Sequence, residues 1–370
     1  MGYVVTPWEV KGVIDYDRLI KQFGIQPLTP ELLNRLKKHT GELHLFLKRG
    51  IFFAHRDLNV ILDTLDSGGD FYLYTGRGPS GHTHLGHLLP WIFTKWLQDK
   101  FNVELYFQLT DDEKYLFNDD MTREQAKKYA YENILDIIAV DFKKGLTKIF
   151  IDTEYISKLY PLAIDVAKRV TFSTAKAVFG FNESSNIGEI FYTSIQSAPA
   201  FIGSVERGKP TPCLIPLAVD QDPHFRVTRD VAGKIGFPKP AILHCKFFPS
   251  LSGLEKMSSS SPETCIYTID KKEDVERKIM NAFTGGQPTI KEQKAKGGNP
   301  DICPIYQYEL FLLEESDEKL KEIKMKCING ELICGEHKKM LIEKIMKFLR
   351  DHQSKREKAK DVIEEYLVRA

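Results

Sequence analysis

Short apolar runs alternate with longer amphipathic stretches along the first two thirds of the chain. Four of the runs are almost continuous in hydrophobic residues, as buried β-strands are, and they cover residues 71–75, 103–109, 148–152 and 213–219. Between the runs, apolar positions recur at helical spacing. Strands that alternate with helices indicate βαβ units and a parallel sheet, and ligands of such sheets bind beyond the carboxyl ends of the strands.

Capping residues predict where several helices begin. Thr122 and Gln125 form a capping box at the start of a helix that runs to about residue 140. Thr29 before Pro30 predicts a second helix start. Further helices are predicted over residues 85–101 and 220–236, a loop over 76–81, and a mixture of helix and loop over 16–66. After about residue 268 the strand pattern ends, and charged amphipathic helices continue to residue 370.

Composition and charge narrow the class of protein. Hydrophobic residues make up 42% and charged residues 28% of the 370 residues, as in ordinary folded domains. No apolar run approaches the ~18 residues of a membrane helix, so we expect no membrane partner. The net charge of +1 gives no bulk attraction to nucleic acid. Six cysteines without a CxxC pair argue against a zinc ribbon or disulfide scaffold and favour a cytoplasmic location.

The segment His84-Leu-Gly-His87 follows the first strand and a glycine-rich loop, and it opens a helix. A helix N-terminus offers free N–H groups and a partial positive charge, so it suits a phosphate group. The two imidazoles and the Arg77 guanidinium can add donors to the same anion. Two ordinary surface or core histidines would give the same pattern. A metal site that also uses His82 lacks nearby Cys or carboxylate partners.

A second segment, Lys256-Met-Ser-Ser-Ser260, lies near the end of the strand region. A lysine on a serine-rich loop can reach phosphates as they gain charge in a transition state. Alone, the segment is equally typical of a solvated serine loop. Because both segments occur in this order on a strand–helix pattern, a shared nucleotide site is the better interpretation.

Together the two segments resemble the signatures of class I aminoacyl-tRNA synthetases. Five runs resemble the tryptophanyl-tRNA synthetases of the eukaryotic and archaeal type, and the resemblance covers nearly the whole chain: residues 74–80, 108–115, 194–199, 218–223 and 256–260. The resemblance implies an α/β fold with a Rossmann-like parallel-sheet catalytic domain over 71–268. An all-helical anticodon-binding domain over 269–370 would follow, and residues 1–70 would be an N-terminal extension packed on the catalytic domain. It also implies activation of L-tryptophan by ATP to tryptophanyl-adenylate and pyrophosphate, followed by transfer to tRNA(Trp).

The resemblance also implies roles for individual residues. Catalytic groups are expected at His84, His87, Lys256, Lys114 and Arg77. Tryptophan is expected against Tyr74, Gln108, Glu113, Gln196 and Gln221. ATP is expected against Gly76, Arg77, Gly78, His84, Gly86, His87, Asp220, Lys256, Met257, Ser258 and Ser260. Mg²⁺ would accompany the phosphates, with no metal ligand from protein side chains. Ser259 stands where the signature has a second lysine, and Lys114 is the candidate substitute.

Positive charge gathers near the end of the chain. Residues 336–360 contain nine Lys and Arg against four Asp and Glu. By resemblance, Lys338 and Lys339 are expected to contact tRNA(Trp). A solvated helix face is the plain alternative for such a run.

The loop at Gly285 and Gly286 resembles the anticodon-reading loop of the family. Gln287 and Pro288 stand where eukaryotic relatives tend to carry an Arg-Asp pair, so the resemblance assigns them no base contact. It also implies a homodimer, with one tRNA spanning both subunits.

Three other functions remain open. A tyrosyl-tRNA synthetase shares the fold, but it would need a carboxylate deep in the pocket for the phenol hydroxyl, where Gln108 is expected. A small-molecule nucleotidyltransferase would not require the long C-terminal region of basic helices. A non-catalytic paralogue acting as an interaction module usually lacks a signature residue, whereas both signatures are present here.

Overall fold

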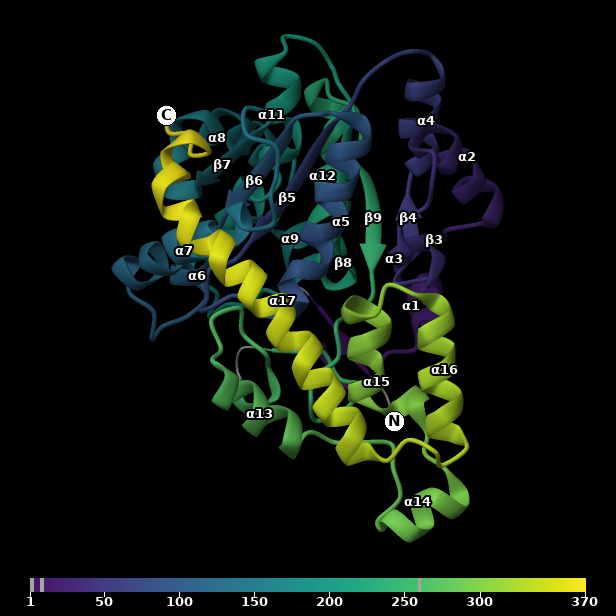
Figure 1. The fold of residues 1–370 in the computed structure, drawn as a ribbon. Coiled ribbons are helices and arrows are strands. Elements are labelled where there is room, and N and C mark those ends of the chain that lie inside the picture. Colours follow the sequence, from purple (N-terminus) through teal and green to yellow (C-terminus); the bar gives the residue numbers. More distant parts are fainter. Residues whose placement is uncertain (1–2, 7–9, 259–260) are drawn as a thin grey trace.

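The computed structural model describes residues 3–6, 10–258 and 261–370, and Figure 1 shows their arrangement. At its centre lies a seven-stranded sheet in the order β3-β4-β9-β8-β5-β6-β7. Five adjacent strands are parallel: β9 (Ala241–Cys245), β8 (Cys213–Ala218), β5 (Tyr72–Arg77), β6 (Leu105–Leu109) and β7 (Thr147–Ile151). At one edge, β3 (Gln26–Pro27) and β4 (Phe52–Arg56) complete the sheet in antiparallel pairings.

The predicted parallel sheet is therefore confirmed for five strands and corrected at one edge. The expectation of only helix and loop over residues 16–66 is wrong, because β3 and β4 lie there. A five-residue run between helices is too short to show a period of its own. The strand β9 is also missing from the prediction. Strand β5 extends to Arg77, so Gly76 and Arg77 belong to a strand rather than to the predicted loop.

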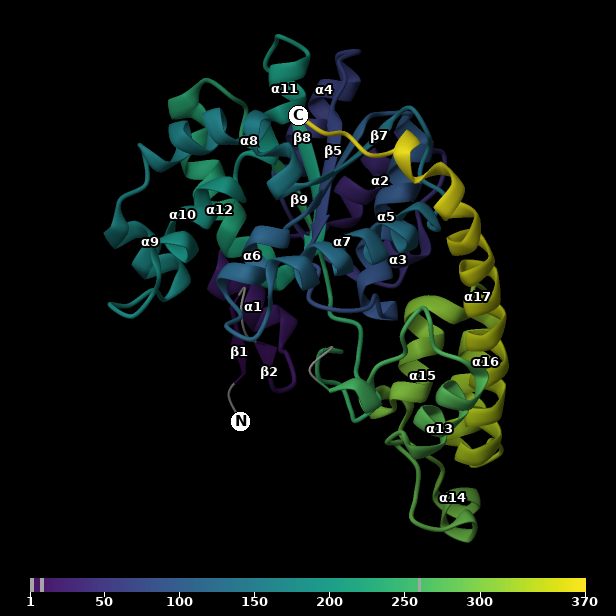
Figure 2. The same cartoon turned by 90° about the vertical axis from the view of Figure 1, so that its left-hand side faces the viewer.

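Helices cover both faces of the sheet, as Figure 2 shows from the side. Successive side chains of a strand point to opposite faces, so Leu73 of β5 joins one core while Tyr72 and Tyr74 join the other. On the Leu73 side lie α5 (Leu85–Phe101) and α7 (Arg123–Ile138). The Tyr72 side packs against α8 (Asp152–Ala167), α11 (Pro199–Glu206) and α12 (Asp222–Ala232).

The predicted helix starts are present with their caps. Thr122 Oγ1 accepts from the Gln125 N–H at 3.2 Å, and Gln125 Oε1 accepts from the Thr122 N–H at 2.8 Å, which confirms the capping box of α7. At the start of α2 (Pro30–Thr40), Thr29 Oγ1 accepts from the Leu32 N–H at 3.3 Å. Each cap satisfies an N–H group that the first turn of a helix leaves open.

The other elements complete the two ends of the chain. An N-terminal hairpin pairs β1 (Val4–Val5) with β2 (Val10–Lys11). The remaining helices near the sheet are α1 (Tyr16–Phe23), α3 (Leu45–Lys48), α4 (Leu58–Asp66), α6 (Asp111–Leu116), α9 (Phe172–Phe179) and α10 (Ile187–Ile195). Beyond residue 270 the structure is helical, with α13 (Lys272–Asn281), α14 (Ile290–Lys296), α15 (Pro304–Tyr308), a π-helix (Glu309–Leu313), α16 (Asp317–Ile328) and α17 (Cys334–Val362).

The long helix α17 joins the helical region to the sheet region (Figures 1 and 2). His352 Nε2 and Arg356 Nε lie 3.0 and 3.2 Å from Asp136 Oδ1 of α7. One apolar core extends from α4 through β5 to α17. Domain boundaries at residues 70 and 268 stay predictions. In the part of the chain that the structure describes, no helix is both long and apolar enough to cross a membrane.

Candidate active site

A cavity of about 280 Å³ opens at the carboxyl ends of β5, β6 and β8, beside the N-terminus of α5. Parallel strands end at one edge, so residues far apart in the sequence meet there. The cavity is lined by most of the residues that the sequence singles out: Tyr74, Gly76, Arg77, Gly78, His84, Gly86, His87, Gln108, Glu113, Lys114, Gln196, Asp220, Gln221, Lys256 and Met257. Ser258 does not line it, and Ser259 and Ser260 lie outside the described residues.

Two glycines allow side chains to come close to the backbone at this edge. A Cβ atom at Gly78 would lie 2.1 Å from Lys114 Cε, and one at Gly86 would lie 3.1 Å from His84 Cε1. Any larger residue at either position would displace a cavity side chain. The glycines of both motifs therefore shape the site by leaving space for Lys114 and His84.

His84 and His87 form a stacked pair at the start of α5. Their ring centroids lie 3.5 Å apart with an interplanar angle of 21°. Burial, reinforced by the charge of Arg77, lowers the pKa of both imidazoles well below the usual value. The rings are therefore neutral at pH 7. His87 Nδ1 accepts from the backbone N–H of His84 at 3.1 Å, so its proton is on Nε2.

Arg77 carries unused hydrogen-bonding capacity into the cavity wall. Its Nε and Nη2 atoms are buried and have no hydrogen-bond partner among the described residues. Burial lowers the pKa of the guanidinium to about 10, although the charges of Glu113 and Asp136 oppose the shift. The group is still a cation at pH 7. Because buried, unpaired N–H groups are costly, this arrangement favours the binding of an anion.

Two lysines at the cavity are each paired with a carboxylate. Lys114 Nζ lies 2.5 Å from Glu113 Oε1. Lys256 Nζ donates to Asp220 Oδ2, while Asp220 Oδ1 is buried without a hydrogen-bond partner among the described residues. A polyphosphate that enters the cavity would offer both ammonium groups further acceptors.

The opposite wall is built for a flat, mostly apolar group. Tyr74 OH donates to Gln108 Oε1 at 2.5 Å and accepts from Gln196 Nε2 at 3.0 Å. Tyr74 and Gln108 are buried. The ring of Phe225 meets the Tyr74 ring edge-on, with centroids 5.8 Å apart. The apolar lining is completed by Ile215 and Leu217.

Glu113 supplies a negative charge between the two halves of the cavity. Burial alone would raise the pKa of Glu113, but Lys114 and a 2.6 Å hydrogen bond from Thr110 Oγ1 outweigh it, and the pKa lies below its usual value. The carboxylate is therefore ionised at neutral pH. This charge can hold an ammonium group of a ligand.

Several residues at the site are absent from the sequence-based prediction. Thr110, Trp91 and Phe225 line the cavity. Behind Gln108 lies Asp152, which is fully buried and accepts from Gln108 Nε2 at 2.9 and 2.8 Å. Asp152 directly follows β7, the neighbour of β6 that carries Gln108. The rule that parallel strands end together could have identified this carboxylate.

No metal centre is formed by side chains in the described ranges. Within them, no group of three or more His, Cys, Asp or Glu side chains is arranged to hold a metal ion. The ring of His82, the third histidine of the motif region, packs edge-on against Tyr129 and Tyr267 at 5.8 and 6.4 Å. These residues do not fit a cation held by the protein alone.

The two lysines expected to contact tRNA(Trp) differ in their exposure. Lys338 is 9% exposed, and its Nζ donates to the carbonyl oxygens of Met280 and Ala282, each at 2.8 Å. The ammonium thus binds the end of α13 and does not face solvent. Lys339 is exposed, and its tRNA contact stays a prediction.

The loop at Gly285 and Gly286 is held by its neighbours. A Cβ atom at Gly285 would lie 1.9 Å from the carbonyl oxygen of Asn299. The Gln287 side chain donates to the carbonyl oxygen of Gly297 at 3.0 Å, and Pro288 is exposed. An anticodon-reading role for this loop stays a prediction.

Known proteins resemble the chain over nearly its whole length. The family described as "tRNA synthetases class I (W and Y)" matches residues 66–350. The tryptophan--tRNA ligase of Pyrobaculum calidifontis is 52% identical over 364 residues, which cover 98% of this chain and 97% of that protein. The tryptophan--tRNA ligase of Pyrococcus furiosus is 52% identical over 367 residues, covering 98% and 94%.

Solved structures agree with these matches. The tryptophanyl-tRNA synthetase of Plasmodium falciparum superposes with a TM-score of 0.87 at 43% identity and covers 93% of this chain and 94% of its own. The enzyme of Aeropyrum pernix gives a TM-score of 0.89 at 32% identity, with 96% and 97% covered. With the sheet, the paired histidines and these similarities taken together, the chain belongs to the class I tRNA synthetases of the tryptophan and tyrosine group.

Proposed function

We propose that the chain is a tryptophan–tRNA ligase that activates L-tryptophan with ATP and transfers it to tRNA(Trp). One observation carries the proposal. A single cavity has buried acceptors on an apolar wall, at Tyr74 and Gln108, and an anion-seeking guanidinium on the other wall, at Arg77. An indole with its N–H fits the first wall and a polyphosphate fits the second. The tryptophan ligases among the relatives support the same substrates.

The ammonium and carboxylate of the amino acid would lie between these walls. Glu113 supplies the charge for the ammonium, and Gln196 and Gln221 orient it. This arrangement leaves the tryptophan carboxylate free to attack the α-phosphorus of ATP. A new bond forms between carboxylate oxygen and phosphorus, and the bond to the β-phosphate oxygen breaks as pyrophosphate leaves.

The residues of the second wall would stabilise the charge that moves to pyrophosphate. His84 and His87 are neutral and can donate N–H groups, while Arg77, Lys114 and Lys256 add positive charge. Such preorganised donors are the main source of rate enhancement in this kind of reaction. Mg²⁺ would accompany the phosphates and share their charge.

The pocket favours tryptophan over tyrosine for a specific reason. A buried carboxylate, Asp152, is present behind the indole wall, but Gln108 stands between it and the cavity. A phenol hydroxyl would have to displace that amide to reach the carboxylate. A site with buried acceptors for a ring N–H also discriminates against phenylalanine, which would leave them unpaired.

ATP–pyrophosphate exchange with each amino acid offered singly tests the function. Tryptophan is expected to support exchange far better than any other amino acid. Better exchange with tyrosine would establish the tyrosyl alternative, and no exchange with any amino acid would favour a non-catalytic role. Charging of tRNA(Trp) then tests the second step.

We also propose that the protein is a cytoplasmic homodimer. Ile156, Tyr160 and Ile164 form an exposed apolar row along α8, and Ile187 at the start of the neighbouring α10 is 84% exposed. Contiguous exposed apolar surface marks interaction sites. All six cysteines are free thiols, which supports a reducing compartment.

Light scattering after size-exclusion chromatography tests the dimer. The wild type is expected at twice the mass of one chain, and Tyr160→Glu is expected to shift it towards the monomer. Met325→Glu, at an exposed apolar residue on α16, is the matched control and should leave the mass unchanged. A monomeric wild type would contradict the proposal.

A further inference from the structure

Behind the indole wall, a chain of hydrogen bonds links the cavity to a buried carboxyl group, and each bond is donated in the direction of that group. Asp152 accepts from Gln108 Nε2 at 2.9 and 2.8 Å. Gln108 Oε1 then accepts from Tyr74 OH at 2.5 Å. Gln196 Nε2 donates to Tyr74 OH at 3.0 Å, and Gln196 Oε1 accepts from Tyr192 OH. Each polar group on this path therefore has a defined donor or acceptor role.

The orientation of the Gln108 amide decides what the cavity offers to a ligand. With Nε2 towards Asp152, the carbonyl oxygen faces Tyr74 and the cavity, and its second lone pair is open to an N–H donor. If the amide were turned over, its NH₂ group would face the cavity and repel an N–H. The identity of the atom at the indole wall thus depends on the partner behind it.

Asp152 is itself fixed in place by its surroundings. It is fully buried at the first position of α8. The next residue, Thr153, donates its backbone N–H and its hydroxyl to the Asp111 carboxylate at 3.1 and 2.6 Å. Burial and the neighbouring Asp112 carboxyl raise the pKa of Asp152 well above its usual value, and the two carboxyls are hydrogen-bonded to each other. With its proton directed to Asp112, Asp152 can only accept from Gln108.

We propose that Asp152 is a positioning residue that makes the site specific for a ring N–H by holding the Gln108 amide in one orientation. The inference deepens the proposed function and depends on it for the identity of the ligand. Asp152 does not line the cavity, and its contact with a lining residue of the indole wall is the pair of hydrogen bonds from Gln108, through which it would act. The chemical class it selects is an aromatic amino acid whose ring carries an N–H donor.

The variant Asp152→Asn tests this role because an asparagine can either accept from the Gln108 NH₂ group or donate to the Gln108 carbonyl oxygen, so it no longer selects one orientation of the amide. The measured quantity is the kcat/KM for tryptophan divided by the kcat/KM for 3-benzothienylalanine, whose ring sulfur replaces the N–H. We expect this ratio to fall about tenfold, the factor of one net hydrogen bond. The tryptophan KM should rise, whereas kcat at saturating tryptophan should change less.

Two further variants separate orientation from packing. In the swap Gln108→Glu with Asp152→Asn, the new asparagine donates to the new carboxylate, whose other oxygen faces Tyr74. The ratio should recover relative to Gln108→Glu alone. Asp111→Asn changes a neighbouring carboxylate at the start of α6. Asp111 accepts from Thr153 and has no hydrogen bond with Gln108, so the ratio should stay unchanged.

Each outcome decides for or against the role of Asp152. A wild-type ratio in Asp152→Asn, or an equal loss in Asp111→Asn, would overturn it. If Asp152→Asn does not fold, the swap is compared with Gln108→Glu, and failure to recover the ratio overturns the role.

A wild-type enzyme that does not activate tryptophan would refute the proposed function separately. The role of Asp152 would then be read from NMR of the Gln108 side-chain NH₂, assigned with Gln108→Glu. Its protons should exchange slowly with water in the wild type and faster in Asp152→Asn, and equal rates would overturn the role.

Discussion

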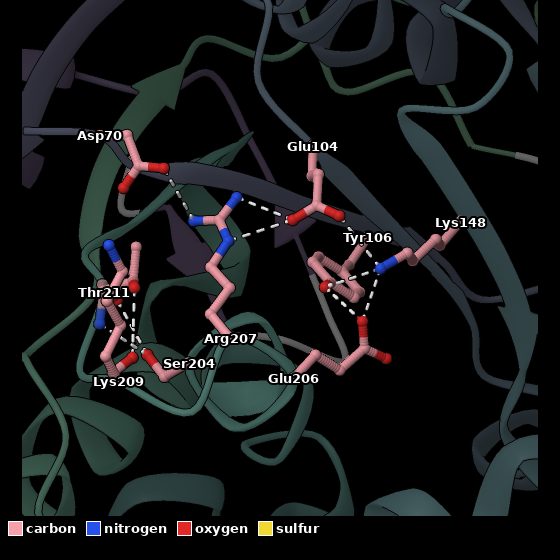
Figure 3. A network of polar contacts seen from close by, with 9 residues as sticks. All are labelled: Asp70, Glu104, Tyr106, Lys148, Ser204, Glu206, Arg207, Lys209 and Thr211. Carbon is pink, nitrogen blue, oxygen red and sulfur yellow. Dashed lines mark hydrogen bonds and ion pairs between the residues drawn. The ribbon is translucent and has the colours of Figure 1, made fainter.

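The charged side chains at the two ends of the parallel strands differ in how completely they are paired within the protein. At the amino ends of β6 and β7, Lys148 contacts Glu206 at 2.5 Å and Glu104 at 3.1 Å, and Arg207 Nη2 contacts Glu104 at 2.8 Å. Figure 3 shows this network, in which Tyr106 also donates to Glu206 at 2.7 Å. At the carboxyl ends, the guanidinium of Arg77 has two nitrogens with no hydrogen-bond partner among the described residues.

Within one sheet, the charged residues at the amino ends of the strands therefore serve stability, and those at the carboxyl ends serve ligand binding. In the amino-end network, opposite charges alternate and pair with one another. Arg207 Nη1, which has no hydrogen-bond partner among the described residues, still lies 3.8 Å from the Asp70 carboxylate, so the network has little to offer a ligand. At the carboxyl end, buried donors lack an anion, which costs stability until a ligand arrives. Changes at the two ends should therefore affect different measurements.

The largest effect is expected from Arg77→Met. It removes the unpaired cation but keeps an unbranched side chain, so pyrophosphate exchange should fall by about 10²–10³-fold, as when one preorganised donor is lost. The free energy of unfolding in urea should stay the same or rise, because a buried unpaired group disappears. An Arg77→Met variant that is clearly less stable yet fully active would show that Arg77 serves stability rather than ligand binding.

Lys114→Ala tests a second cation at the carboxyl end of the strands. Lys114 stands beside Gly78 at the cavity and is the candidate for the lysine that Ser259 replaces. Adenylate formation should slow by about 10²-fold, whereas tryptophan binding measured by calorimetry should change far less. Unchanged pyrophosphate exchange would show that another group compensates for the missing signature lysine.

Low pH should reduce the free energy of unfolding, because two histidines are buried at the carboxyl ends of the strands. The pKa of His84 and His87 lies well below 6.5 in the folded state because of burial. The unfolded chain therefore binds more protons, and the stabilisation present above pH 6.5 is lost as the pH falls below it. His84→Asn should reduce the slope of unfolding free energy between pH 6.5 and 5 by about 1 kcal/mol per pH unit, because the unfolded histidine goes from half to almost fully protonated over this range. Glu104→Gln should leave the slope unchanged in that range, since its network contains no histidine.

The smallest effect is expected at the amino end. Glu104→Gln removes the charge that joins Lys148 and Arg207 and should lower the free energy of unfolding by about 1 kcal/mol while exchange activity stays intact. Glu357→Gln, in an exposed pair with Lys360 on α17, is the matched control and should change almost nothing. Loss of exchange activity in Glu104→Gln would show that the amino-end network influences the active site at the other end of the strands.

Local patterns predicted the elements that depend on nearby residues. The strand carrying Tyr74 and the capping box of Thr122 are visible in the sequence because each has its own period or spacing. The strands β4 and β9 escaped prediction because their pairing is long-range and neither segment has a distinctive period.

The same contrast between local patterns and long-range contacts applies to the residues of the site. The motifs around His84 and Lys256 predicted that both residues belong to one site, and both line the cavity. Asp152 was not predicted because it contacts Gln108 from the end of a neighbouring strand. A count of charges could not show that Lys338 turns inwards to the end of α13, because which lysine of a run faces the protein depends on packing.

The pairing of β4 with β9 also has a consequence for the nascent chain. Ala54 pairs with His244, so β4 leaves the ribosome long before its partner exists. At about 5–20 residues per second, the intervening segment takes roughly 10–40 s to emerge. During that interval β3 can already pair with one side of β4, but the side that later pairs with β9 has no partner strand. The apolar side of β4 that faces β9 is thus exposed to aggregation for that part of translation.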